Sequence, residues 1–494
     1  MVLPIDNPTK SFWIEGSESP LRNQRSTADL PKQTDVLIIG SGYTGASFAY
    51  WLQKFACNGA SPDMVMLEAR DVCGGATGRN GGQLRPHFYS RYRNWSTRFG
   101  ADGALKVIQH EAAHLKAFDK LLKSEGIAKK VCFKLGETFD AAMSEEAWVR
   151  LKGEYELMKE DHGENGPIIG ECRLIEDPKE AEEFTQMKGC IGAVVHPSGQ
   201  VWPYKFVHAL LEILLTTAKF NLQSHTPALE VSARDADGYI TVSTPRGDIK
   251  AKTVVHATNR WAGHLLDEFQ KLIHGGRGTI AAIKAPEGFI KNTGAQHWDA
   301  VINNYHLQLP PPYNTIIIGG AKPLTVHDPW QYINNDKEDE QFRGVLEFYA
   351  GWPKRDIVGW QGNNPADLEK KVEDGGVWSG VYSSSIDSFP FVGPVPRRDG
   401  HFVAAGFAGH GMPRILGSTA HLAPLVLREL GIDYDTPEAA AIFPPLPDPF
   451  YATEQRIDLL QSVDAIKKFQ DDVNDHLASS KKPFAAPYPQ IVTD

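Results

Sequence analysis

The chain of 494 residues is poor in cysteine, has no excess of basic residues and contains no long apolar run. Its five cysteines form no CxxC pair and no cluster with histidine, so we expect neither a metal site nor a disulfide framework, which fits a reducing compartment. The net charge of −10 offers no basic surface to a phosphate backbone, so no nucleic-acid partner is expected. No segment reaches the ~18 apolar residues of a membrane-spanning helix, and no membrane contact is expected.

Targeting signals are missing as well. The N-terminal residues have no apolar core like that of a signal peptide, and the last residues, Pro489–Asp494, are not a peroxisomal signal. We therefore expect the protein in the cytoplasm. What the chain does have is the composition of a globular protein, with 41% hydrophobic and 23% charged residues, at a length that predicts more than one domain.

A strand, a glycine turn and a helix follow one another near the N-terminus. The apolar run Asp35–Ile39 leads into Gly40-Ser-Gly42-Tyr-Thr-Gly45, and an apolar helical stretch follows. Gly40 permits the tight turn, Gly42 lets the backbone approach a pyrophosphate, and Gly45 lets the helix pack against the strand. The free N–H groups at the start of the helix attract phosphates. This pattern predicts a dinucleotide site.

The second strand of this unit, Met64–Leu67, ends on Glu68. A carboxylate at this point accepts hydrogen bonds from both hydroxyls of an adenosine ribose and would repel a 2′-phosphate, which disfavours NADP. A GxGxxG sequence alone arises by chance in glycine-rich loops, and the chain contains 45 glycines. The strand before it, the helix after it and the glutamate together favour a dinucleotide site over chance.

The segment after Glu68 separates FAD from NAD. Ala69–Gln83 contains five glycines in fifteen residues, a composition that lets the backbone approach a ligand closely, here the ribityl chain and the isoalloxazine. With its sequence GATGRNGGQ, this segment resembles the corresponding loop of the D-amino-acid oxidase/glycine oxidase superfamily of FAD-dependent oxidoreductases. The resemblance extends most to gamma-glutamylputrescine oxidase and to related fungal and bacterial FAD-dependent amine oxidases.

Three later segments resemble the same superfamily. They are Gly192–Pro203, which precedes a helix at about 204–218, then Lys252–Asn259, and finally Trp378–Pro394 with His401–Met412. The resemblance implies an α/β fold, α+β overall, in which a Rossmann-like FAD-binding domain is interleaved with a β-sheet substrate domain. The expected FAD-binding segments are 1–90, 190–268 and 375–435, the substrate domain takes 91–189 and 269–374, and a tail at 436–494 wraps the surface.

Within the substrate segments, hydrophobic patterns predict helices near 104–122 and 146–159 and strands near 131–142 and 315–319. Close to the C-terminus, a strand at 401–405, a glycine loop at 406–411 and a helix at 414–430 form a second strand–loop–helix element. The positive end of this helix would stabilise the reduced flavin at its N1/C2=O edge. A structural turn without a ligand also fits the sequence.

The fingerprint, the glycine loop and the family resemblance predict FAD held without a covalent bond. Relatives can link flavin through a histidine or cysteine, but here Gln83 follows the loop and cannot form that bond. The predicted cofactor-binding residues are Gly40, Gly42, Tyr43, Thr44, Gly45, Glu68, Ala69, Arg70, Gly75, Ala76, Thr77, Arg79, Asn80, Gly81, Gly82, Gln83, Leu84, Thr258, Asn259, Gly406, Gly409, His410, Gly411 and Met412.

The resemblance implies that an amine or amino acid is oxidised at a C–N bond by hydride transfer to flavin N5, with an imine as product and oxygen as the acceptor. The chain has no second GxGxxG for NAD(P)H and no CxxxxC, which disfavours a monooxygenase and a disulfide reductase. Two alternatives stay open. One is a biosynthetic flavoenzyme that closes a ring or desaturates a larger intermediate, and the other is a non-catalytic FAD-binding protein.

Three residues are candidates for catalysis or substrate binding. Arg85 can hold a substrate carboxylate with two hydrogen bonds, although a surface or phosphate-facing role fits the sequence equally well. His410 lies in the glycine loop and can hydrogen-bond near the isoalloxazine or be a structural histidine. Lys284 receives the role of activating oxygen from the resemblance alone. Tyr382 and Trp202 are candidates for the pocket wall.

Overall fold

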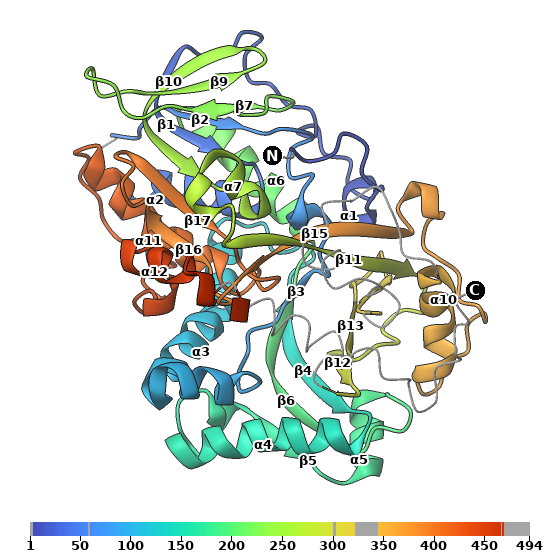
Figure 1. Ribbon diagram of the computed structural model, residues 1–494. Helices are drawn as coiled ribbons and strands as arrows, with labels where there is room; N and C mark the ends of the chain where they lie inside the picture. The colour runs from blue at the N-terminus through green and yellow to red at the C-terminus, as the bar shows by residue number, and fades with distance from the viewer. Residues whose placement is uncertain (1–2, 58–59, 300–302, 322–343, 466, 469–494) are drawn as a thin grey trace.

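The computed structural model describes residues 3–57, 60–299, 303–321, 344–465 and 467–468. Two β-sheets, each covered by its own helices, make up most of the molecule (Figure 1). One is a largely parallel sheet of the Rossmann type and the other is a curled mixed sheet, so the predicted α/β fold is confirmed. Segments far apart in the sequence alternate between the two sheets, and the chain crosses between them several times.

The first sheet has a parallel core of five strands in the order β17-β10-β1-β2-β7, extended by the antiparallel strand β16 and by a small meander of β8 and β9. Its strands are β1 (Gln33–Ile39), β2 (Met64–Leu67), β7 (Phe220–Gln223), β8 (Glu230–Val231), β9 (Ile240–Thr244), β10 (Gly247–His256), β16 (Phe391–Pro394) and β17 (His401–Ala405).

Apolar side chains on both faces explain why β1 is central. Val36 and Ile38 face the helices, whereas Leu37 and Ile39 face the layer formed by β9 and the outer half of β10. A strand buried on both faces reads as a continuous apolar run, which is the pattern that predicted it. The helices packed on this sheet are α2 (Tyr43–Phe55), α6 (Pro203–Thr217) and α11 (Ile415–Glu429).

The second sheet is mixed and runs in the order β15-β11-β14-β13-β12-β4-β6-β3, with β5 beside β6. Its strands are β3 (Gln83–Leu84), β4 (Lys134–Ala142), β5 (Arg173–Ile175), β6 (Gly192–Gln200), β11 (Ile273–Ile283), β12 (Thr293–His297), β13 (Asn303–Gln308), β14 (Ile316–Gly319) and β15 (Val377–Ser385). The helices around it are α3 (Tyr92–Ser124), α4 (Glu145–His162), α5 (Pro178–Thr185) and α10 (Val345–Asp356).

Short helical turns complete the described chain. They are α1 (Phe12–Glu15), α7 (Ala262–Leu265), α12 (Glu454–Leu460) and the 3-10 turns η1 (Ala76–Arg79), η2 (Ile169–Glu171), η3 (Asn259–Trp261), η4 (Asp267–Phe269), η5 (Val372–Asp374) and η6 (Asp448–Phe450).

The elements expected from the sequence are present with shifted ends. The helix expected at 104–122 is the second part of α3, which begins at Tyr92 and bends at Gly100, where φ is 73°. The strand expected at 131–142 begins only at Lys134, because the chain turns before it. β6 and β15 lie in segments expected to bind FAD, yet both pair within the second sheet.

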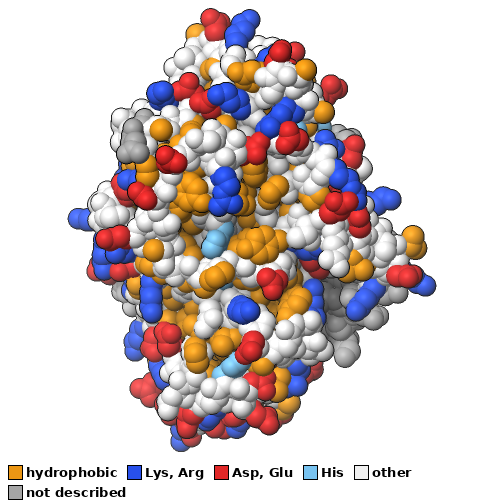
Figure 2. Space-filling view, turned by 90° about the vertical axis from the view of Figure 1, so that its left-hand side faces the viewer, with side chains coloured by type: hydrophobic (Ala, Val, Ile, Leu, Met, Phe, Trp, Pro, Cys, Tyr) orange, Lys and Arg blue, Asp and Glu red, His pale blue; other side chains and the backbone are white. Residues whose placement is uncertain are grey.

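The tail after residue 435 does more than wrap the surface. Phe443, Leu446 and Phe450 are buried in the main apolar core, and Tyr451 forms a bridge with Val392 of β16. Acidic and basic side chains are interspersed over the face shown in Figure 2, rather than gathered into one field. Among the described residues, the structure contains no helix long and apolar enough to cross a membrane.

Candidate active site

A cavity of about 690 Å³ lies between the two sheets. Its wall includes the ends of β1, β2 and β10, the glycine loop 74–83, part of β15 and the loop 406–413. Its far end is lined by residues of the second sheet and of α3 and α4. The volume lies within the ~300–1,000 Å³ range of ligand pockets. Of the predicted cofactor-binding residues, all but Gly45, Leu84 and Gly406 line this cavity.

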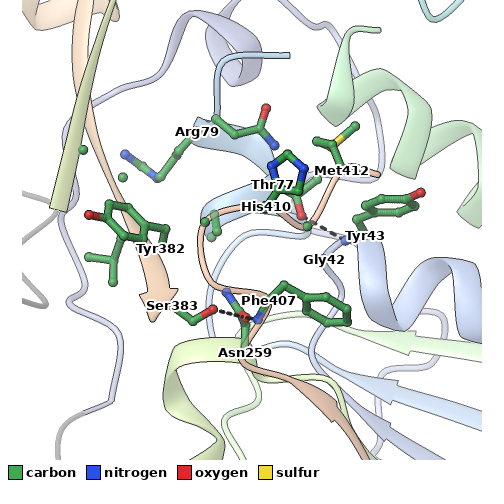
Figure 3. Close-up of a pocket in the computed structure, with 18 of the residues that line it drawn as sticks. Gly42, Tyr43, Thr77, Arg79, Asn259, Tyr382, Ser383, Phe407, His410 and Met412 are labelled. Carbon is green, nitrogen blue, oxygen red and sulfur yellow. Dashed lines mark hydrogen bonds between the residues drawn. The ribbon is translucent and has the colours of Figure 1, made fainter. Parts of the chain in front are cut away.

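The turn after β1 has the geometry that a dinucleotide needs. Gly40 has φ of 107°, and a Cβ there would lie 2.6 Å from the carbonyl oxygen of Ala257. A Cβ on Gly45 would collide with the carbonyl oxygen of Gly40, so Gly45 supports the turn from behind. Gly42 caps α2 without a side chain, which leaves the start of the helix open to a phosphate. Thr77 accepts a hydrogen bond from the Tyr43 amide at 3.0 Å (Figure 3).

Glu68 is fixed at the end of β2 by three hydrogen bonds. Its carboxylate accepts from the amide of Ser41 at 3.1 Å, from the hydroxyl of Ser41 at 2.6 Å and from the amide of Arg70 at 3.0 Å. Because Glu68 also lines the cavity, its remaining acceptor capacity faces the place where an adenosine ribose would lie.

The glycine loop is held by a buried arginine. The guanidinium of Arg79 donates to the carbonyls of Gly74 at 2.9 Å, Thr9 at 2.6 Å and Ser379 at 2.9 Å, which ties the loop to β15. Trp378 donates to the carbonyl of Arg79 at 2.9 Å. Arg79 therefore shapes the loop from inside, and Figure 3 shows its side chain between the loop and β15.

Residues 3–16, which we call the N-terminal strap, lie over the same loop. Ser11 donates to the carbonyl of Gly78 at 2.6 Å, and the indole of Trp13 donates to the carbonyl of Asn80 at 2.5 Å. Trp202 is packed behind the strap and donates to the carbonyl of Trp13 at 2.9 Å. The interpretation of Trp202 as pocket wall is therefore wrong, because its indole is buried in this aromatic cluster and does not line the cavity.

Asn259 connects the loop 406–411 to β15. Its side-chain oxygen accepts from the Ser383 hydroxyl of β15 at 2.8 Å and from the Gly406 amide at 3.2 Å (Figure 3). Beside it, the hydroxyl of Thr258 and the indole nitrogen of Trp261 are buried in the cavity wall without a partner among the described residues. Buried polar atoms without a partner are expected where a polar ligand binds. These observations fit FAD.

The buried carboxylate of Glu111 joins three segments of the chain. It lies where the expected flavin position meets the substrate end of the cavity. Glu111, in the middle of α3, accepts from the amide of His87 at 2.8 Å, from His410 Nε2 at 3.0 Å and from Arg414 Nε at 2.8 Å. We call Glu111, His87, His410 and Arg414 the Glu111 cluster. Burial opposes the charge on Glu111, but His410 and Arg414 outweigh it and hold the pKa of this carboxyl well below its usual range.

A second buried carboxylate lies deeper in the second sheet. Asp140 of β4 accepts from Arg85 at 2.8 Å, from His297 at 2.5 Å and from the hydroxyl of Tyr89 at 2.7 Å. We call these four residues the Asp140 cluster. Burial opposes its ionisation, yet Arg85 and His297 keep the pKa of Asp140 well below its usual range. Arg85 thus lines the cavity, as expected, but much of its guanidinium is used by Asp140.

Two other arginines face the cavity with more donors available. Arg91 precedes α3, and its guanidinium has no hydrogen-bond partner among the described residues. Arg150 of α4 donates weakly to His297 Nδ1 at 3.3 Å, and its Nε is buried without a partner in the described part of the chain. Surrounding protein and then Arg150 lower the pKa of Arg91, although its side chain stays accessible through the cavity. Two guanidiniums with spare donors, near enough for Arg150 to lower the pKa of Arg91, can bind an anion.

The Glu111 cluster also has the residue types of a metal centre. His87, Glu111 and His410 offer ligand atoms within 4.8 Å of one another. However, the two imidazoles are stacked at 4.0 Å with planes 20° apart, and one oxygen of Glu111 already accepts from the His87 amide and from His410. Arg414 occupies the other oxygen of Glu111. The arrangement is therefore that of a hydrogen-bonded cluster rather than a metal centre.

Lys284 is not brought to the site. It lies exposed after the end of β11, where its amide donates to the carbonyl of Asp367, and it does not line the cavity. The long pairing of β11 with β15 carries the chain past the cavity before Lys284 is reached. Leu84 is buried in β3, and Gly406 lies behind the loop at φ of 77°. Tyr382 does line the cavity, opposite His410 in Figure 3.

Several of these residues were not predicted as functional, among them Glu111, Asp140, Arg91 and Arg150. One signal was available for Glu111. It falls on the apolar face of its helix, three or four positions after Val107 and Ile108, where a lone carboxylate needs a buried partner. The others come from segments without a motif and gave no such signal.

A family model described as "DAO: FAD dependent oxidoreductase" matches residues 35–424. The chain is 24% identical to human mitochondrial dimethylglycine dehydrogenase over 446 residues, which covers 84% of this chain and 44% of that protein. The rat protein of the same name matches over 52% of this chain and 26% of its own length. The chain thus spans less than half the length of these curated relatives.

Solved structures show the same fold. Glycine oxidase from Geobacillus kaustophilus superimposes with a TM-score of 0.62 at 20% identity, covering 86% of this chain and 99% of that one. L-proline dehydrogenase from P. horikoshii also gives 0.62, at 19% identity, and covers 81% of this chain and 94% of that one.

Proposed function

Because the chain belongs to the FAD dependent oxidoreductase (DAO) family, we propose that it binds FAD without a covalent bond and oxidises a C–N bond of an amine that also carries an anionic group, such as an amino acid. When bound, FAD supplies the hydride acceptor. Glu68 would hold the adenosine ribose, the open start of α2 the pyrophosphate, and the loops 74–83 and 406–411 the flavin.

The observation that carries the substrate class is the pair Arg91 and Arg150. Both line the far end of the cavity, and both have donors that the described protein does not use. A planar guanidinium binds a carboxylate with two parallel hydrogen bonds, and a second positive charge beside it strengthens the attraction for an anion. Arg85, the carboxylate anchor expected from the sequence, would act mainly through Asp140.

The names of the similar proteins support the same class, since dimethylglycine, glycine and L-proline are all amino acids. From the sequence of the loop 74–83, we propose that the chain is related, within the family, to gamma-glutamylputrescine oxidase and the fungal amine oxidases. Oxygen as the acceptor is part of the proposal, without a role for Lys284. A location in the cytoplasm and the absence of nucleic-acid and membrane partners stay predictions from the sequence.

The test is anaerobic mixing of the FAD-loaded protein with matched substrates. Amino acids and N-methyl amino acids should bleach the flavin band, whereas the corresponding amines without a carboxylate should do so weakly. Arg91→Gln and Arg150→Gln should each raise the half-saturating concentration about 10- to 100-fold, as expected for losing a charged hydrogen bond. Arg397→Gln, which breaks an exposed ion pair with Glu454, is the matched control and should change nothing.

Three outcomes would contradict the proposal. Equal bleaching by amines with and without a carboxylate would remove the anion site. Yellow colour that stays in an acid-precipitated pellet would show covalent flavin. Bleaching only by a larger intermediate, or by nothing, would favour the biosynthetic or the non-catalytic alternative. Release of hydrogen peroxide in air then decides whether oxygen is the acceptor.

A further inference from the structure

The Glu111 cluster has a feature that substrate binding leaves unexplained. The carboxylate of Glu111 is completely buried, yet it hydrogen-bonds His410 in the loop 406–411, next to the expected flavin position. Burying a charge is costly, and a structural tie between α3 and the loop could be made by neutral groups. The carboxylate and the imidazole together instead resemble an acid–base pair.

We propose that His410 accepts the proton of the substrate's ammonium group and that Glu111 positions its imidazole for this transfer. The inference rests on the proposed function, because an amine gives up hydride only as the neutral base. His410 is the catalytic residue of the pair, since it lies in the cavity wall. Glu111 acts through it and is a positioning residue.

The geometry fixes both the tautomer and the ring. His410 Nε2 lies 3.0 Å from a carboxylate oxygen of Glu111, so this nitrogen carries the proton and donates it to the hydrogen bond. Nδ1 is then the unprotonated nitrogen, and it has no hydrogen-bond partner among the described residues. The ring of His87 stacks on His410 at 4.0 Å and stops it from rotating. Arg414 holds the second oxygen of Glu111 at 2.8 Å, which fixes the carboxylate as well.

The groups around His410 act on its pKa in opposite directions. Burial lowers the pKa of His410, Glu111 of α3 raises it, and Arg414 and Arg91 lower it further. His87, the other titratable group against the ring, has a pKa well below its usual range because of burial and then of His410. The net shift of the His410 pKa is downward, so the imidazole is neutral and ready to accept a proton.

The transfer is balanced in atoms and charge. An N–H bond of the ammonium breaks, its electron pair stays on the amine nitrogen, and the proton forms a new bond to Nδ1. The positive charge moves from the substrate to the imidazole, beside the carboxylate of Glu111, so the total charge of the site is unchanged. The proton then passes to solvent through the open cavity.

The kinetic test compares Glu111→Gln with Glu268→Gln. Glu268 is also paired with an arginine, Arg398, at 2.8 and 3.0 Å, but it lies outside the cavity wall. Glu111→Gln should slow the anaerobic reduction by substrate about 10- to 100-fold and move its acid limb to lower pH, because the charge that raises the His410 pKa is gone. His410→Gln should cost about 10²- to 10⁴-fold, and Glu268→Gln should leave the rate and the pH profile unchanged.

A second measurement does not depend on turnover. In protein labelled with ¹⁵N-histidine, the His410 signal is identified by its loss in His410→Gln. We expect this signal to show the Nε2-protonated tautomer and a midpoint below that of an ordinary histidine. In Glu111→Gln the midpoint should fall further, and in Glu268→Gln it should not move. The opposite tautomer, or the same midpoint in Glu111→Gln as in the unmodified protein, would overturn the pair.

The outcomes separate this inference from the proposed function. If amines are oxidised and the pH profile of Glu111→Gln matches that of the unmodified protein, the acid–base pair is wrong and the proposed function stands. If no amine reduces the flavin, the proposed function fails and the proton acceptor fails with it, whatever the titration shows. If Glu111→Gln and His410→Gln lose FAD to the same extent, Glu111 only supports the loop 406–411 and the acid–base pair is overturned.

Discussion

Two buried carboxylates, Glu111 and Asp140, use the same chemistry for different purposes. Each is almost inaccessible to solvent, with 0% and 1% exposure, and each is bound by one arginine and by histidine, Glu111 by His410 and Asp140 by His297, with His196 3.8 Å from the second oxygen of Asp140. The partners of Asp140 all come from the second sheet or from the segment that follows β3. The partners of Glu111 include His410 of the loop 406–411 and Arg414, the residue preceding α11, and both line or adjoin the expected FAD position.

The connectivity explains the different roles. In the Asp140 cluster, the charges are satisfied within one wall, so the pair stabilises that wall and orients Arg85 and His297. In the Glu111 cluster, the charges cross from the substrate helix α3 to the cofactor loop, and one nitrogen of His410 remains for chemistry. Buried carboxylates with similar partners therefore need not have similar functions. The segments that each carboxylate joins are a better guide to its role.

The largest expected effect is on stability and separates the two clusters directly. Asp140→Ala leaves the partly buried Arg85 and His297 without this partner, and we expect a loss of up to about 3–5 kcal/mol in the free energy of unfolding. Urea unfolding at saturating FAD measures this. The absorption spectrum of the FAD-loaded protein should stay unchanged, because the cluster does not reach the cofactor loop. A loss below about 1 kcal/mol would mean that water reaches Arg85 and replaces the carboxylate.

The next effect concerns a neutral histidine beside each cluster. Burial lowers the pKa of His306, near Arg85, to about 3 and that of His114, on α3, to about 4. Below pH ~6.5 the unfolded chain binds a proton at each site that the folded protein does not bind, so stability falls as pH decreases. Each histidine contributes about 1.4 kcal/mol per pH unit, and the contribution stops only below its folded pKa.

Urea midpoints at a series of pH values test this in His306→Gln and His114→Gln. In each variant, the free energy of unfolding should fall less steeply with decreasing pH, by about 1.4 kcal/mol per pH unit. If one variant leaves the slope unchanged, that histidine is charged in the folded protein, and its cluster is more hydrated than the other.

A smaller effect is expected at the N-terminal strap, which supports the cofactor loop from outside both clusters. Trp13→Phe keeps the aromatic packing but removes the hydrogen bond to the carbonyl of Asn80. We expect the dissociation constant of FAD to rise about 5-fold, as for the loss of one hydrogen bond of about 1 kcal/mol. Trp360→Phe, which removes a similar bond to Asn363 outside the cavity, is the control. Equal FAD affinity in both variants would show that the strap does not support the loop.

The smallest expected effect is none. Lys284→Ala should leave FAD affinity, reduction by substrate and reoxidation in air unchanged, because the side chain is exposed and outside the cavity. Stopped-flow reoxidation measures the last of these. A slower reoxidation would restore Lys284 as an oxygen-activating residue and would place the reactive region beyond both clusters.

Most of the residues predicted to bind FAD line the cavity, whereas the residues that fill its other end were largely not predicted. Gly40, Gly42 and Glu68 belong to one continuous βαβ unit, where each residue's role follows from its place in a strand, turn or helix. The catalytic candidates rested on single residues. Among them, Arg85 and His410 line the cavity and Lys284 does not, since nothing local specifies how far a long strand such as β11 carries the chain.

By itself, the sequence determined the fold class and the glycine positions and led to FAD as the predicted cofactor, because these depend on backbone conformation and on neighbours within a few residues. The tertiary structure alone decided which charges meet. Glu111 and Arg414 are 303 positions apart, and Asp140 and His297 are 157 apart. Buried charges need partners, but the folding of two interleaved sheets selects those partners, and no local pattern records the choice.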